Sequence, residues 1–194
     1  MKVLHVYCHP LEESFHRALR DEVATGLAEA GHAVDMLDLY AEGFDPVLTA
    51  DARRHYHDTS RNQRGLETYV ERLRTADALV VQFPTWAFGA PAMLKGFFDR
   101  MIMPGVAFDI SDPAHVRPLL GNIRKLAGVV TYGRPRWMAL YVGDPPRKLV
   151  TRYLRWFIDR RAGTTYLALY HMNVADDACR RAFMTRVRRA MARF

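Results

Sequence analysis

The chain has 194 residues, of which 49% are hydrophobic and 25% are charged, and its formal net charge is +7. This length predicts a single domain, residues 1–194, with a core large enough to fold without a disulfide or a bound metal. No window approaches the roughly 20 apolar residues of a membrane-spanning helix, and the first residues lack the pattern of a secretory signal. We therefore expect a cytoplasmic protein without membrane insertion.

The positive charge is concentrated in residues 147–161 and 180–193. A basic surface can bind nucleic acid or an acidic partner, and this remains an alternative function. No nucleic-acid-binding motif accompanies the charge, so we favour a solvated face or a field that attracts phosphates, with no nucleic-acid partner. The two cysteines, Cys8 and Cys179, form no C-x-x-C pair, which predicts no metal site and two reduced thiols.

Short β-branched runs alternate with longer segments of helical periodicity. In chain order we predict a strand at 2–8, a helix at 14–30, a strand at 33–39, a surface loop at 43–61, a helix at 63–74, a strand at 78–83, a helix at 91–101, a strand at 125–131, a helix at 146–159, a strand at 164–171 and a helix at 176–193. This alternation predicts an α/β protein, a doubly wound five-stranded parallel sheet with helices on both faces.

The flavodoxin-like strand order, 2-1-3-4-5, is the natural choice for five such strands. Ligands of these sheets bind beyond the carboxyl ends of the first and third strands, where the strand order reverses. The chemistry should therefore use the loops that follow residues 8, 83 and 131.

The first of these loops carries His9, Ser14, Phe15 and His16. Ser14 is placed to cap the following helix, and a helix N-terminus with a hydroxyl suits a phosphate. The alternative is a capped helix with a turn histidine and no ligand. The loop lacks the glycines of G-x-G-x-x-G, so a nicotinamide dinucleotide bound in Rossmann style is not expected.

The second loop is Pro84-Thr85-Trp86-Ala87-Phe88. Trp86 and Phe88 stand at the end of a buried strand, where they can wall a flat aromatic ligand while backbone groups meet its polar rim. The alternative is that both rings fill the core. The third loop is Thr131-Tyr132-Gly133, followed by Arg134 and Arg136, whose guanidinium groups either meet anionic groups of a ligand or are simply solvated.

These loops resemble those of the flavodoxin-like NAD(P)H:quinone oxidoreductases, the family of DT-diaphorase and of the quinone reductases associated with potassium-efflux systems. The resemblance rests on residues 82–100 (QFPTWAFGAPAMLKGFFDR), His9-Pro10 with Ser14-Phe15, residues 38–40 with 44–46, and residues 131–133. Arg134 stands where the family commonly has a second glycine. His16 replaces an asparagine that is frequent in members that bind FAD.

The resemblance implies a bound flavin, FAD or FMN, and NAD(P)H as co-substrate. His9, Ser14, Phe15 and His16 would hold its phosphate side, Pro84, Thr85, Trp86, Ala87 and Phe88 would line the isoalloxazine ring, and Thr131, Tyr132 and Gly133 would border its far edge. The segment around Phe108 would reach a flavin site, often that of the partner in a homodimer. The choices between FAD and FMN and between NADH and NADPH stay open.

The implied reaction is ping-pong hydride transfer from NAD(P)H, through the flavin, to a quinone or similar flat acceptor. Tyr132 or Tyr141 is the candidate catalytic hydrogen-bond donor to the quinone oxygen. The alternative is a flavin-binding electron carrier or a regulatory subunit of a transport system, without efficient NAD(P)H turnover. Residues 91–101 carry more apolar groups than one narrow helix face needs, which predicts a homodimer that buries part of them.

Overall fold

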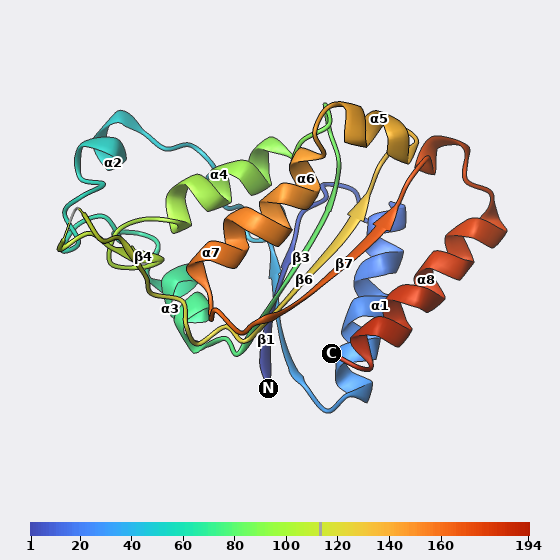
Figure 1. The fold of residues 1–194 in the computed structure, drawn as a ribbon, viewed down its shortest axis with the longest axis horizontal. Coiled ribbons are helices and arrows are strands. Elements are labelled where there is room, and N and C mark those ends of the chain that lie inside the picture. The colour runs from blue at the N-terminus through green and yellow to red at the C-terminus, as the bar shows by residue number, and fades with distance from the viewer. Residues whose placement is uncertain (113) are drawn as a thin grey trace.

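The computed structural model describes residues 1–112 and 114–194. Its main sheet has five parallel strands in the order β2-β1-β3-β6-β7 (Figure 1), with β1 at Lys2–Tyr7, β2 at Ala33–Asp38, β3 at Ala78–Pro84, β6 at Lys125–Thr131 and β7 at Gly163–Leu169. This is the predicted 2-1-3-4-5 order. Every residue of β3 is buried, as the continuous apolar run predicted for a strand covered on both faces.

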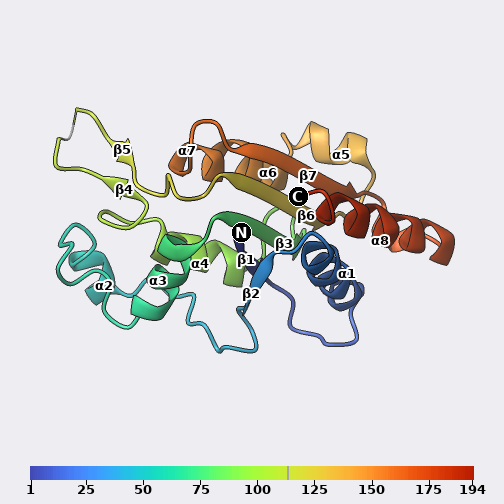
Figure 2. The same cartoon turned by 90° about the horizontal axis from the view of Figure 1, so that it is seen from below.

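Two groups of helices cover the two faces of the sheet (Figure 2). Helices α1 (Phe15–Glu29) and α8 (Asp177–Met191) share one buried cluster with the sheet. Helices α3 (Glu67–Thr75) and α4 (Ala92–Met101) pack in the cluster on the opposite face. The periodicity of these four helices in the sequence was sufficient to predict them, because each buries one apolar stripe.

Several elements differ from the sequence prediction. The segment 43–61, predicted as a loop, contains α2 (Ala50–Arg54), which Thr49 caps. The helix predicted at 146–159 consists of α6 (Pro145–Lys148), a π-helical turn η1 (Leu149–Leu154) and α7 (Arg155–Phe157). Helix α5 (Arg136–Tyr141), a 3-10 turn η2 (Met172–Val174) and the small hairpin of β4 (Phe108–Asp109) and β5 (Arg117–Pro118) were not predicted.

The apolar residues of α4 correct one sequence argument. Leu94, Phe97, Phe98 and Met101 are all buried within the monomer, whereas Met93 is partly buried. These side chains pack between the sheet and the loop that precedes the helix. They therefore leave no exposed apolar stripe on α4 for a second subunit to bury. The prediction of a homodimer therefore needs a different basis.

No helix within residues 1–112 and 114–194 combines the length and the apolar character that crossing a bilayer requires. The same part of the chain places no three His, Cys, Asp or Glu side chains where they could share a metal ion.

Candidate functional site

Backbone hydrogen bonds bring the three predicted loops together at the carboxyl edge of the sheet. The Cys8 N–H donates to the Gln82 carbonyl at 3.0 Å, which joins the ends of β1 and β3. The Thr85 N–H donates to the Thr131 carbonyl at 2.8 Å, which joins the loops after β3 and β6. The edge predicted from the strand order is thus where the three loops meet.

The first loop combines a helix start with a neutral histidine. Ser14 has extended backbone and its Oγ accepts the Arg17 N–H at 3.2 Å, so Ser14 is the N-cap of α1. The first N–H groups of α1, those of Phe15 and His16, have no partner within the helix. The His9 Nδ1 accepts the Leu11 N–H at 3.1 Å, which leaves Nε2–H as its free donor. Desolvation lowers the pKa of His9, in keeping with this neutral form.

The His16 side chain is buried and belongs to a hydrogen-bond chain that the sequence did not reveal. Its Nε2 lies 2.7 Å from the Thr131 Oγ1, and the Gln82 Nε2 donates to its carbonyl at 2.7 Å. The Gln82 Oε1 lies 3.0 Å from the Nε2 of His5, which is also fully buried. Burial lowers the pKa of His16 to about 3 and that of His5 to about 4, so both rings are neutral at pH 7. Because the His16 ring is buried and bonded to Thr131, only the backbone of His16 can serve as a donor to a ligand.

The second loop is a tight turn in a strained conformation. Trp86 and Gly89 exchange both backbone hydrogen bonds, at 3.1 and 2.9 Å, around Ala87 with φ of 48° and Phe88 with φ of 58°. Two consecutive positive φ values define a type I′ turn, which normally takes Asn-Gly. Placing Ala and Phe there costs on the order of 1–2 kcal/mol per residue, and strain of this kind gathers at functional sites.

The aromatic rings of this turn are not core residues. Trp86 is 43% exposed and Phe88 is half-buried, and neither belongs to a buried cluster. The structure thereby contradicts the alternative that both rings fill the core. The N–H groups of Ala87 and Phe88 donate to no backbone carbonyl in the described part of the chain, so they remain available to a ligand. Trp86 also meets the ring of His9 edge-on, with centroids 6.2 Å apart.

The second and third loops together form a hollow of about 190 Å³. The residues that line it come from these two loops alone: Thr85, Ala87 and Phe88 from one and Tyr132, Gly133 and Arg134 from the other. A Cβ on Gly133 would lie 2.9 Å from the Asn173 Oδ1, so a larger residue would push this wall out of place.

The two predicted catalytic tyrosines do not come together. The Tyr132 side chain is 1% exposed; its hydroxyl donates to the Asp144 Oδ1 at 2.6 Å and lies 2.5 Å from the Tyr166 hydroxyl. Burial raises the pKa of Tyr132 far above its ordinary value. Tyr141, on α5, is 87% exposed. The Tyr132 hydroxyl is thus engaged inside the protein, and Tyr141 alone presents its hydroxyl to solvent.

Asp144 was not identified from the sequence, although the segment 143–148 was recognised as unassigned. Its side chain accepts the Arg147 N–H and caps α6, and its φ of 48° places it in the left-handed region. An Asp followed by Pro145 and Pro146 is a helix-start pattern that could have placed it. Its role is to hold the underside of the third loop through Tyr132.

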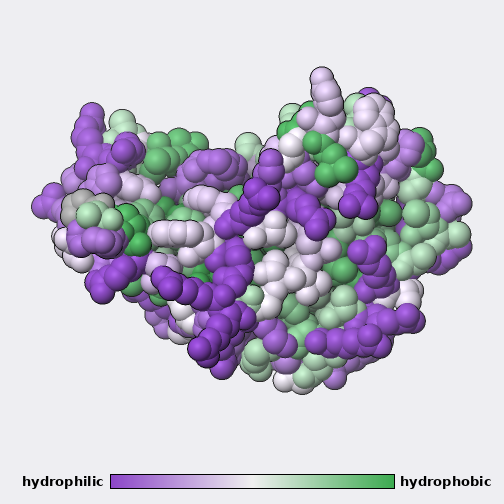
Figure 3. Space-filling model, viewed as in Figure 1, coloured by the Kyte–Doolittle hydropathy of each residue, from purple (hydrophilic) through white to green (hydrophobic). Residues whose placement is uncertain are grey.

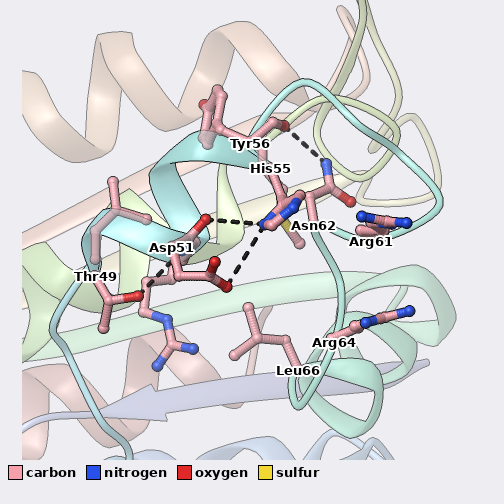
Figure 4. Close-up of a pocket in the computed structure, with 12 residues that line it drawn as sticks. Thr49, Asp51, His55, Tyr56, Arg61, Asn62, Arg64 and Leu66 are labelled. Atoms are coloured by element: carbon pink, nitrogen blue, oxygen red, sulfur yellow. Dashed lines mark hydrogen bonds and ion pairs between the residues drawn. The ribbon is translucent and has the colours of Figure 1, made fainter.

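A second cavity, of about 230 Å³, lies beside α2 (Figure 4) and shares no lining residue with the hollow. His55 there contacts the carbonyl and carboxylate of Asp51, and Asn62 donates to the Tyr56 carbonyl. Arg61 and Arg64 also line it. This cavity has no strained backbone among the described residues, which is why the strand edge, with its strained turn and free N–H groups, is the stronger candidate site.

The strand order and the meeting of three loops at the carboxyl edge define a protein of the flavodoxin-like class. A family model described as "Flavodoxin-like fold" matches residues 1–182, and the chain belongs to this family.

Known relatives and solved structures agree with this class. The chain is 34% identical over 126 residues to the ribosyldihydronicotinamide dehydrogenase [quinone] of Pongo abelii, covering 56% of this chain and 54% of that protein. It is 31% identical over 140 residues to an uncharacterised NAD(P)H oxidoreductase of Escherichia coli, covering 72% and 63%. The chain thus spans about half the length of the first of these curated relatives.

Two solved structures match almost throughout. Smu.1420 from Streptococcus mutans has a TM-score of 0.85 at 29% identity, with 100% of both chains covered. The NAD(P)H:quinone oxidoreductase from Methanothermobacter marburgensis has a TM-score of 0.83 at 26% identity, covering 99% of this chain and 98% of that one.

Proposed function

We propose that the chain is a flavin-dependent NAD(P)H oxidoreductase that reduces quinones or similar flat acceptors. The observation that carries this proposal is the strained Ala87–Phe88 turn, whose free N–H groups border the hollow between the second and third loops. A turn held at such a cost needs a function that uses its geometry. Its similarity to proteins named quinone dehydrogenases and quinone oxidoreductases supports the same reaction.

The donors at the strand edge fit a flavin. The N–H groups of Phe15 and His16, the Ser14 hydroxyl and the His9 Nε2–H suit its phosphate side, because a helix N-terminus favours an anion. The loop 84–88 offers Trp86 and Phe88 to its flat ring and backbone N–H groups to its polar rim. The loop 131–133 would border the far edge of the ring.

When bound, the flavin would supply the redox chemistry, so that NAD(P)H, a proton and a quinone yield NAD(P)⁺ and the hydroquinone. The chain itself would position the reactants and exclude water. Trp86 and the exposed Trp137 would flank the acceptor. Tyr141 would donate a hydrogen bond to the acceptor oxygen, whereas Tyr132 would act on the same site by holding the third loop on Asp144.

We further propose a single cytoplasmic domain that assembles as a homodimer, now on a different basis. Val116, Leu119, Tyr153 and Trp156 are large apolar groups that stay between 41% and 49% exposed. Val116 and Trp156 line one shared groove, which places β5 beside η1 and α7. Arg152, Arg155 and Arg160 line the same groove. Large exposed apolar groups that gather in this way are typical of a subunit interface, which here would be isologous. Sedimentation of the wild type and of Trp156→Arg tests it: a dimer that Trp156→Arg weakens is expected, and a wild-type monomer would contradict it.

The central experiment measures flavin binding and turnover separately. Titration with FMN and with FAD, followed by flavin fluorescence, should give saturable binding of at least one of them. Steady-state oxidation of NADH or NADPH should then depend on an added quinone. Flavin binding without turnover would favour an electron carrier or regulatory subunit, and failure to bind either flavin would contradict the proposed function.

A further inference from the structure

Arg134 places an unpaired positive charge at the rim of the hollow. Its side chain is exposed and lines the hollow together with Ala87 and Phe88. Among residues 1–112 and 114–194, Arg134 makes no ion pair with any carboxylate, whereas Arg17, Arg20 and Arg72 each pair with two acids. The guanidinium is therefore free to pair with an anionic group of a ligand.

The backbone beneath Arg134 is held firmly. The His171 N–H donates to the Arg134 carbonyl at 2.9 Å, and Tyr132 is fixed from both sides by its bonds to Leu169 and Met172, each 2.8 Å long. The buried pair of Tyr132 and Asp144 anchors the same loop from below. The side chain thus projects from a fixed point, which lowers the entropy lost when it pairs with an anion.

The surface beyond Arg134 carries both exposed apolar side chains and positive charge. Helix α5 begins at Arg136 and exposes Trp137, Leu140 and Tyr141, and hydrophobic and hydrophilic surface adjoin in this region of the space-filling view (Figure 3). Arg136 has no ion-pair partner in the described part of the chain either. Such a surface matches a molecule that is flat and apolar but carries a fixed negative charge.

We propose that Arg134 makes the site selective for flat acceptors that bear a carboxylate or sulfonate group. The aromatic part of the acceptor lies beside the flavin that the two loops would hold, and its anionic group pairs with the guanidinium at the rim of the hollow. This inference rests on the proposed function. The same anionic chemistry occurs in the phosphates of NAD(P)H, and the experiment below separates the two sources.

The test compares two acceptors of nearly equal size, 1,4-naphthoquinone-2-sulfonate and 2-methyl-1,4-naphthoquinone. Arg134→Gln removes the charge and Arg134→Lys keeps it. Arg193→Gln is the matched control, because the adjoining Phe194 ring packs under Lys125 at the start of β6, the edge of the sheet opposite the loops.

For Arg134→Gln we expect the ratio of kcat/KM for the sulfonate to that for the methyl quinone to fall about two- to fivefold, mainly through KM, because an exposed ion pair contributes this much. Arg134→Lys should keep part of the preference and Arg193→Gln all of it. In the wild type the preference should shrink as salt is added, because dissolved ions screen exposed charges and the Debye length falls to about 8 Å at 0.15 M. An unchanged ratio in Arg134→Gln, or an equal change in Arg193→Gln, would overturn the proposal.

Pre-steady-state mixing separates the two half-reactions. If Arg134→Gln weakens reduction by NADPH or NADH but leaves the acceptor ratio as it was, the guanidinium serves the nucleotide and the proposal is wrong. Equilibrium binding of the sulfonate, followed by quenching of tryptophan fluorescence without NAD(P)H, gives a readout that needs no turnover. If the protein shows no turnover but binds the sulfonate more weakly as Arg134→Gln, the inference holds and the proposed function is wrong. If Arg134→Gln binds both quinones as tightly as the wild type does, the inference is wrong.

Discussion

The imidazole of His16 and the hydroxyl of Thr131, 115 positions apart in the sequence, are joined by a buried hydrogen bond of 2.7 Å. His16 lies in the first turn of α1 and Thr131 at the end of β6. The bond fixes the start of α1 relative to the loop that closes the hollow. Because Gln82 of β3 donates to the same histidine, all three loops are tied to one buried point.

This buried histidine predicts a loss of stability in acid. His16 has a pKa of about 3 when folded and an ordinary value of 6.5 when unfolded, so between these values the unfolded chain binds a proton that the folded chain does not. The free energy of unfolding should be highest above pH 6.5 and fall toward pH 3, with a slope of up to about 1.4 kcal/mol per pH unit from this residue. Urea titrations at a series of pH values measure it.

His16→Gln keeps a hydrogen-bonding side chain and removes the titration, so its stability should depend less steeply on pH than that of the wild type. The same titrations on His32→Gln, a change outside the buried chain, provide the comparison. Equal slopes in the wild type and His16→Gln would show that the ring is not buried in its neutral form.

The strained turn predicts a conflict between stability and binding. Replacing Ala87–Phe88 by Asn-Gly gives the turn the residues that adopt positive φ most readily, so the free energy of unfolding should rise by about 2–4 kcal/mol, the strain of two residues. Loss of the Phe88 ring should at the same time weaken flavin binding, by about 1 kcal/mol or more. Melting of the flavin-free protein and a flavin titration test both effects. Phe88→Gly alone is the control that removes the ring and changes only one turn position; a double variant less stable than the wild type would contradict the assigned strain.

The buried tyrosine should matter for stability before it matters for chemistry. Tyr132→Phe removes the donor to Asp144 and leaves that carboxylate buried without it, which should cost about 1–3 kcal/mol of unfolding free energy. Tyr141→Phe changes a hydroxyl that is exposed, so its stability should be unchanged within about 0.5 kcal/mol while its kcat falls. Urea unfolding measures the stability of both variants, and steady-state kinetics measure their kcat. A stable but inactive Tyr132→Phe would restore Tyr132 as the donor.

Gly96 in α4 predicts a reversal of the usual helix rule. Alanine normally stabilises a helix by about 1 kcal/mol relative to glycine. A Cβ at Gly96 would lie 2.3 Å from the Pro46 carbonyl oxygen, so Gly96→Ala must displace the loop that packs on α4 and should cost about 1–3 kcal/mol. Gly121→Ala meets no atom within 4 Å and is the control. A Gly96→Ala protein as stable as the wild type would mean that this loop yields without cost.

The sequence predicted the sheet and the edge at which the three loops meet, because both follow from periodicity and strand order, which local residues determine. It predicted the loops but not the direction of each side chain within them. Tyr132 and Trp86 both follow a buried strand, yet one ring points into the core and the other to solvent. The Tyr132 side chain points inward because its hydroxyl bonds to Asp144, which lies 12 positions further along the chain. Such pairings between distant residues leave no local pattern, and the same holds for His5 with Gln82.

The close contact between α1 and α8 has a consequence for the order of synthesis. Gly26 lies so near α8 that a Cβ there would be 2.5 Å from the Arg188 carbonyl oxygen. Helix α8 also supplies Phe183, Val187 and Met191 to the cluster on this face of the sheet. On the ribosome, this face stays partly uncovered until residues 177–191 have been made, so the nascent chain exposes apolar surface that chaperones recognise. Truncation before residue 177 should therefore yield an aggregating chain rather than a smaller folded one.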